Sequence, residues 1–274
     1  MAYSKLRFCA VICITLLSFQ SFGQSPWLNN NNPGFFAFEF SKVKLSGGND
    51  GLGFLTAVYD LSGGFSVGEK TELIVDLPIS HFKASESSFP SETTIGNLYV
   101  GIRTGDRSKP LRVEIGASLP TTAEDKLFAS SFGTLALLNR EEKFTPNTWG
   151  LNAKLTAEKP INDNGLYYRV RGGLLYWKLK DFDVSLLHLD LMGQIGLRTS
   201  DGIGVLAAIN SRVGLTEDSK FGEDDAASFL FALGASYRSK NFEPGLTLNV
   251  PLDDPYQDAV SNVFNVSLLF HLED

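Results

Sequence analysis

The chain has very little cysteine, and what it has lies near one end. Cys9 and Cys13 are the two cysteines among 274 residues, and both fall in an apolar stretch near the N-terminus. If that stretch is removed as a targeting segment, no thiol remains. This excludes a disulfide framework, catalysis by a thiolate and a zinc site with cysteine ligands.

Long apolar runs are scarce as well. The run FCAVICITLLSF follows Lys5 and Arg7 and precedes the small residues Ser21 and Gly23. It is shorter than the about 20 residues that a membrane-spanning helix needs, and its flanks are typical of a secretory signal. We therefore predict a signal peptide at 1–23, a polar leader at 24–33 and a single domain at 34–274.

Positive charge is in short supply. The net charge is −7, and removal of the signal peptide takes away two basic residues and no acidic ones, which leaves −9. Because nucleic-acid-binding surfaces are basic, we expect no nucleic acid partner. The chain has three histidines, with no metal-ligand spacing and no phosphate-binding loop, so we expect no metal and no cofactor.

Two-residue alternation is abundant. The stretch LHLDLMGQIGLR at 187–198 has apolar residues at its odd positions, whereas its even positions include His188, Asp190, Gln194 and Arg198. A period of two predicts a β-strand with one apolar and one polar face. Segments of about ten residues have the length that a tilted strand needs to cross a bilayer. Twelve segments alternate in this way: 36–40, 55–67, 73–79, 98–102, 111–119, 149–157, 168–176, 187–198, 203–213, 229–237, 246–252 and 264–272.

The connections between these segments alternate in length. Short turns such as 68–70 and 199–202 alternate with longer, acidic loops, a pattern typical of Gram-negative outer-membrane barrels with periplasmic turns and extracellular loops. Tyr168 and Tyr176 are spaced to match the two aromatic girdles of such a barrel. We predict an all-β, antiparallel, up-and-down transmembrane β-barrel of twelve strands in the outer membrane, with both termini periplasmic.

The loop at 121–147 is too apolar to lie free in water, since it contains Phe128 and Phe132 among several leucines. Thr122 and Asp125 fit the start of a helix in a capping-box arrangement. We predict that the loop folds over or into the barrel mouth and narrows it. The alternative is an added hairpin, which raises the strand count to fourteen.

Charged side chains on the polar face of the strands are predicted to line the lumen. They form either a charged pore wall, with Arg169 and Arg171 attracting anions, or a salt-bridge network that fills the interior. Acidic loop residues, Glu141 and Glu142 among them, are predicted to be solvated and to bridge divalent ions to lipid headgroups, or to form a cation-collecting vestibule. The predicted lumen residues are Glu72, Asp76, Arg103, Arg112, Glu114, Lys154, Glu158, Arg169, Arg171, His188, Asp190, Arg198, Arg212 and Arg238.

Three stretches within 71–121 carry a family resemblance: TELIVDLPIS, IGNLYVGIRTG and LRVEIGASLPT. With Leu77–Pro78, Gly96–Asn97 and 118–121 (SLPT), they resemble the outer-membrane family named after the MetA pathway of phenol degradation. The resemblance implies a channel or transporter for small molecules, without implying phenols. It also implies outer-membrane lipid, the barrel-assembly machinery and a small-molecule solute as partners.

The sequence thus predicts a channel for passive passage of small molecules. One alternative is an occluded barrel with a structural or surface-interaction role. Another is an outer-membrane hydrolase, which needs a serine within reach of a histidine. His188 and Asp190 share one strand face, but no serine motif adjoins them, so we predict that the chain is not an enzyme.

Overall fold

The computed structural model describes residues 34–48, 52–85, 90–106, 109–162, 164–180, 183–216 and 227–272. The predicted signal peptide at 1–23 and the polar leader at 24–33 lie outside the described residues.

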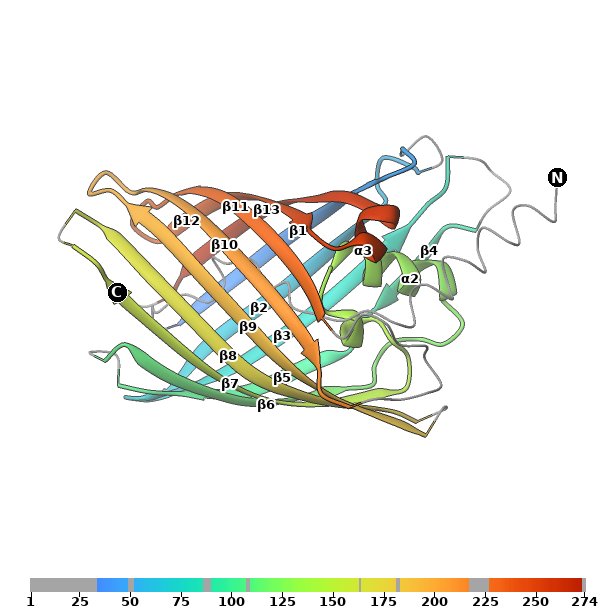
Figure 1. Ribbon diagram of the computed structural model, residues 1–274, viewed down its shortest axis with the longest axis horizontal. Helices are drawn as coiled ribbons and strands as arrows, with labels where there is room; N and C mark the ends of the chain where they lie inside the picture. The colour runs from blue at the N-terminus through green and yellow to red at the C-terminus, as the bar shows by residue number, and fades with distance from the viewer. Residues whose placement is uncertain are drawn as a thin grey trace.

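The described strands form one closed antiparallel barrel (Figure 1). Apart from β4 and β5, neighbours in sequence are hydrogen-bonded neighbours in the sheet; β1 pairs with β13, and the β2–β3 pairing completes the ring. The predicted fold class is confirmed. The strands are β1 (Phe35–Leu45), β2 (Ala57–Gly68), β3 (Thr71–Phe82), β4 (Glu92–Ile95), β5 (Leu98–Thr104), β6 (Leu111–Leu119), β7 (Thr148–Pro160), β8 (Leu166–Leu179), β9 (Val184–Arg198), β10 (Ile203–Gly214), β11 (Ala227–Tyr237), β12 (Phe242–Pro251) and β13 (Val260–His271).

The short strand β4 is an addition to the twelve predicted strands. It pairs with the end of β3, while β5 pairs with the beginning of β3. Three residues lead from Asp76 to Ile79 on β3, whereas four lead from Ile95 to Tyr99 opposite them. The extra residue is a bulge at Gly96–Asn97, so β4 and β5 follow one another along the same edge of β3.

The polar face of the strands is the buried one, as a transmembrane barrel requires. On β9, Leu191 and Ile195 are 47% and 50% exposed, whereas His188 and Asp190 are 0% and 3% exposed. Tyr168 and Tyr176 also lie on the exposed face. Among the described residues, no helix is both long enough and apolar enough to span a membrane.

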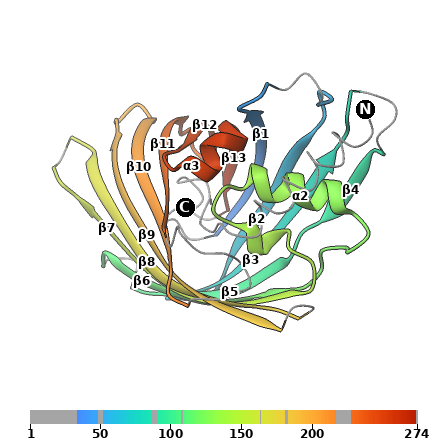
Figure 2. The same ribbon diagram turned by 45° about the vertical axis from the view of Figure 1, so that its right-hand side comes forward.

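One end of the barrel carries the short turns, and we call it the short-turn end; the opposite end is the loop end. At the loop end, α2 (Leu127–Ala136), the 3-10 helix η1 (Glu141–Lys143) and α3 (Asp254–Ala259) gather at the mouth (Figure 2). Phe132, Leu135 and Leu138 pack in one cluster with Val43 and Val58 from the inner faces of β1 and β2. The segment 121–147 therefore lies in the mouth, and the alternative of an added hairpin is wrong.

The start of α2 differs from the prediction. Its N-cap is Lys126, which makes no capping hydrogen bond through its side chain. Instead, the Glu92 carboxylate of β4 accepts hydrogen bonds from the N–H groups of Phe128 and Ala129, at 3.0 and 3.2 Å. The predicted capping box at Thr122 and Asp125 is wrong, because a carboxylate from a neighbouring strand satisfies the helix N-terminus.

Candidate functional site

The inserted segment, residues 121–147, is anchored to the barrel wall at the bulge. The side-chain amide of Asn97 donates to the carbonyl oxygens of Glu142 and Thr145, at 2.6 and 2.8 Å. Its side-chain oxygen accepts hydrogen bonds from the N–H groups of Thr121 and Thr122 and from the Thr122 hydroxyl. One buried asparagine thus fixes both ends of the segment.

Gly96 allows this close approach. A Cβ atom there would lie 2.4 Å from the Lys143 carbonyl oxygen and 2.7 Å from Pro78 Cγ. Real Cβ contacts are not this short. The bulge position next to Asn97 therefore requires glycine so that η1 can rest against the wall.

Residues 140–143, with the sequence REEK, form a charged strut across the lumen. Its two cations face β2 and β3. Arg140 reaches Asp60 at 3.1 Å and Asp76 at 2.5 Å, and Lys143 reaches the same two carboxylates at 2.7 and 2.6 Å. All four side chains are buried, so the contacts are little screened by solvent.

The two acids of the strut face the opposite direction. Arg212 of β10 lies 3.5 Å from Glu141 and 3.3 Å from Glu142, and 2.7 Å from Asp190 of β9. The Tyr256 hydroxyl of α3 donates a hydrogen bond to Glu141. Glu141 and Glu142 are buried, so the prediction that they are solvated loop residues is wrong. Their contacts with Arg212 of the wall stabilise them inside the mouth.

The strut connects opposite walls. In the sheet order, β5, β6, β7 and β8 lie between β3 and β9, and β1, β13, β12 and β11 lie between β2 and β10. The two anchoring strand pairs are therefore diametrically opposed around the ring. Because the strut binds both, it crosses the interior of the barrel rather than following one wall.

A second ionic cluster lies nearer the short-turn end. Glu114 of β6 contacts Arg103 at 2.9 Å and Lys154 at 3.3 Å, and it accepts a hydrogen bond from the Tyr99 hydroxyl at 2.8 Å. Arg103 also lies 3.5 Å from Glu72. This cluster joins β3, β5, β6 and β7 across their inner faces.

Further ion pairs line the remaining wall at the short-turn end. Arg169 of β8 binds Glu158 of β7, and Glu243 of β12 contacts Arg198 of β9 at 3.4 Å and His271 of β13 at 3.3 Å. Charged groups of both signs therefore occupy much of the inner wall, whereas β11 carries none.

The structure places the sequence-predicted residues on the inner face of the barrel. Eleven of the fourteen are buried, while Glu158, Arg198 and Arg238 are partly exposed at the short-turn end. Sequence reasoning missed Asp60, Asn97, Arg140 and Lys143 as site residues. Asp60 could have been predicted, since it has the inward phase of its alternating segment. Asn97 belongs to the stretches that carry the family resemblance, but nothing there marks it as an anchor, and nothing local marks Arg140 and Lys143.

The three histidines lie apart from one another. His81 contacts the Thr93 hydroxyl at 2.8 Å, His271 contacts Glu243, and the ring of His188 packs 5.7 Å from that of Trp177. Within the described ranges, no group of His, Cys, Asp and Glu side chains is arranged to hold a metal ion. That the chain is not an enzyme stays a prediction.

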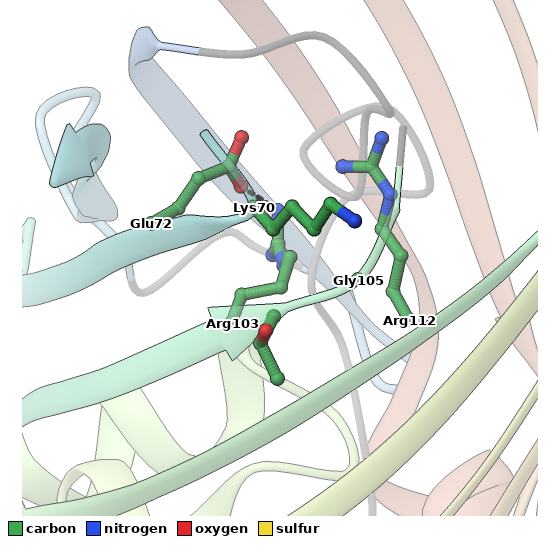
Figure 3. A pocket seen from close by; sticks show the side chains of 6 residues that line it. Lys70, Glu72, Arg103, Gly105 and Arg112 are labelled. Atoms are coloured by element: carbon green, nitrogen blue, oxygen red, sulfur yellow. Dashed lines mark ion pairs between the residues drawn. The ribbon is translucent and has the colours of Figure 1, made fainter. Parts of the chain in front are cut away.

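A small pocket opens at the short-turn end between β3, β5 and β6 (Figure 3). It lies closer to the short-turn end than the ionic cluster around Glu114, and Arg103 and Glu72 belong to both. Its lining residues are Lys70, Glu72, Arg103, Thr104, Gly105 and Arg112.

Comparison with known proteins identifies the fold and no family. No family model and no curated protein sequence matches the chain, so the resemblance to the MetA-pathway family stays a prediction. An outer-membrane channel from Pseudomonas putida F1 is 10% identical, with a TM-score of 0.61 over 87% of this chain and 95% of that one.

Two further solved structures have the same barrel fold. The KdgM porin, solved in complex with disordered oligogalacturonate, is 9% identical with a TM-score of 0.51 over 87% of this chain and 99% of that one. LpxR from Salmonella typhimurium is 10% identical with a TM-score of 0.52 over 87% of this chain and 100% of that one. The chain thus has the fold of outer-membrane β-barrel channels and porins.

Proposed function

We propose that the chain is an outer-membrane channel for the passive passage of small water-soluble molecules, and that the inserted segment sets the width of the passage. The observation that carries this proposal is the charged inner wall of a closed twelve-strand barrel, crossed at one level by the strut. A polar interior behind an apolar exterior is typical of barrels that conduct water and solutes. The fourteen inner-face residues predicted from the sequence are the proposed lining.

The strut also supports a second candidate, a barrel closed at its mouth without transport. Its contacts with opposite walls stabilise a filled cross-section. The two candidates differ in one measurable respect, because only a channel conducts ions when the purified protein is reconstituted.

Single-channel recording in a planar bilayer tests the proposal. We expect wild-type protein to give small ohmic steps, and a variant lacking 124–142 to give steps several-fold larger, since it loses α2 and most of the strut. Equal conductance of the two proteins contradicts the constriction. Silence of both, with the barrel folded, contradicts the channel and favours the closed barrel.

We also expect the inserted segment to respond to pH through Glu141. Burial raises the pKa of Glu141 to about 8, against the lowering effects of Arg212 on β10 and the Tyr256 hydroxyl on α3; neighbouring Glu142 adds to the rise. Because this pKa lies above the ordinary value of 4.5, the folded state binds this proton more tightly than the unfolded chain does. The stability of the inserted segment therefore falls as the pH rises through this window.

The measurement is the fraction of time spent in a larger-conductance state, which we expect to rise between about pH 5 and about pH 9. Glu141→Gln should flatten this dependence. Glu124→Gln, in the exposed part of the same segment, is the matched control and should keep it. A Glu141→Gln variant with the wild-type pH profile would refute the role of Glu141.

A further inference from the structure

We infer that the pocket at the short-turn end is an anion-binding site, which selects small solutes carrying a carboxylate or phosphate group. This inference rests on the proposed channel function, because the site lies on the inner wall near the exit of the lumen. It is carried by the residues that converge on one small pocket, three of which are basic.

Arg103 and Glu72 form the fixed side of the pocket. Arg103 is held 2.9 Å from Glu114 and 3.5 Å from Glu72. Its charge is therefore balanced within the wall, and it serves to position the neighbouring strands. The acid in the lining, Glu72, is the partner of this arginine.

Lys70 and Arg112 bring two further positively charged side chains to the pocket. Figure 3 shows their charged ends pointing toward the same space, Lys70 from the turn before β3 and Arg112 from the beginning of β6. Arg112 is buried, and a guanidinium stays ionised in such a place. The Lys70 side chain is 62% exposed, and its contact with Asp106 at 3.6 Å is a weak surface pair. Two cations directed into one pocket favour an anionic group between them.

The backbone holds both residues in position. The Gly105 N–H donates to the Lys70 carbonyl oxygen at 3.0 Å, which ties the two turns together. A Cβ atom at Gly105 would lie 3.0 Å from Arg112 Cγ and 2.8 Å from the Leu111 carbonyl oxygen. Glycine at this position therefore lets Arg112 lie across the turn and reach the pocket.

The chemistry of the lining indicates the class of ligand. An arginine fork binds two oxygens of one carboxylate or phosphate, and lysine adds a point charge. The pocket is too small to enclose a large molecule, so only the anionic group of a solute would approach its lining, and we expect short organic acids and phosphate esters to be favoured.

Binding of inorganic phosphate to the full-length protein in detergent tests the site without any need for conduction. We expect titration calorimetry to show saturable binding to wild type, weakened by about tenfold or more in Lys70→Gln/Arg112→Gln, as for the loss of charge-assisted contacts. Lys240→Gln removes a lysine from another short turn and should bind as wild type does. Heat-modifiable gel mobility verifies that each barrel is folded.

Lys70→Gln alone keeps the test decisive if the double variant fails to fold, because Lys70 is largely exposed and its loss should still weaken binding several-fold. Absence of phosphate binding to wild type, or equal binding to wild type and the Lys70 variant, overturns the site. If the protein binds phosphate but gives no ion current, the result supports the anion-binding site and contradicts the proposed channel function. In a conducting protein, Lys70→Gln/Arg112→Gln should lower the chloride-to-potassium permeability ratio, and Lys240→Gln should not.

Discussion

The double variant Asp60→Asn/Asp76→Asn should release the strut from β2 and β3. Both carboxylates contact Arg140 and Lys143 in a buried setting. Removing the charge from one side of a buried ion pair costs about 3–5 kcal/mol, because the remaining charge stays desolvated. Since each 1.4 kcal/mol is about tenfold in an equilibrium constant, the population with the segment displaced should rise by about two to three and a half orders of magnitude.

Single-channel recording is the measurement, and we expect a large-conductance state resembling that of the variant lacking 124–142. The quadruple variant that adds Arg140→Gln and Lys143→Gln removes both sides of the pairing. It should recover much of the closed population, because none of these four side chains then keeps a buried charge without its partner. Asp201→Asn, in an exposed short turn, is the control. A double variant that conducts as wild type does would show that these contacts do not hold the strut.

Gly96→Val should displace the inserted segment by a steric route. The added Cβ would meet the Lys143 carbonyl oxygen at 2.4 Å and Phe144 Cε1 at 2.9 Å. The added Cβ is fixed to the backbone of the wall, and the Lys143 carbonyl oxygen belongs to the backbone of η1. Neither atom can rotate away, so η1 has to move off the wall. Asn97→Ala should act in the same direction, because it leaves buried carbonyl and N–H groups without partners, at about 1–3 kcal/mol each.

Limited proteolysis of the reconstituted protein, read by mass spectrometry, measures this effect. Cleavage within 121–147 should be faster than in wild type by at least about tenfold, since cleavage follows the population of the open form. Gly193→Val is the matched control, because a Cβ atom at Gly193 meets nothing within 4 Å. Unchanged cleavage in both Gly96→Val and Asn97→Ala would contradict the anchoring role of the bulge.

The fold could be predicted from the sequence because alternation is a local signal. Within each strand, the alternation of apolar and polar residues indicates which side chains face inward. His188 and Asp190 could therefore be assigned to the inner wall from the stretch 187–198 alone. In the structure both side chains are buried. The pairing of β1 with β13 then follows from closure of the ring.

The strut could not be predicted in the same way, because its partners are remote. Arg140 contacts Asp60 across 80 positions in the chain, and Arg212 contacts Glu142 across 70. Locally, REEK has the composition of a solvated loop, and this led to the wrong prediction for Glu141 and Glu142. The anchoring role of Asn97 could not be predicted for the same reason, since its side chain binds carbonyl groups of a distant segment.

The placement of the strut also constrains the order in which the protein is built. One set of its contacts comes from β2 and β3, which precede the strut in the sequence. The other set comes from β9 and β10, which follow the strut. Neither set suffices to span the cylinder, so the mouth is filled only once the later strands have been added. The strut can therefore take its final position only in a barrel that already contains both strand pairs, and its ion pairs mark a completed cylinder.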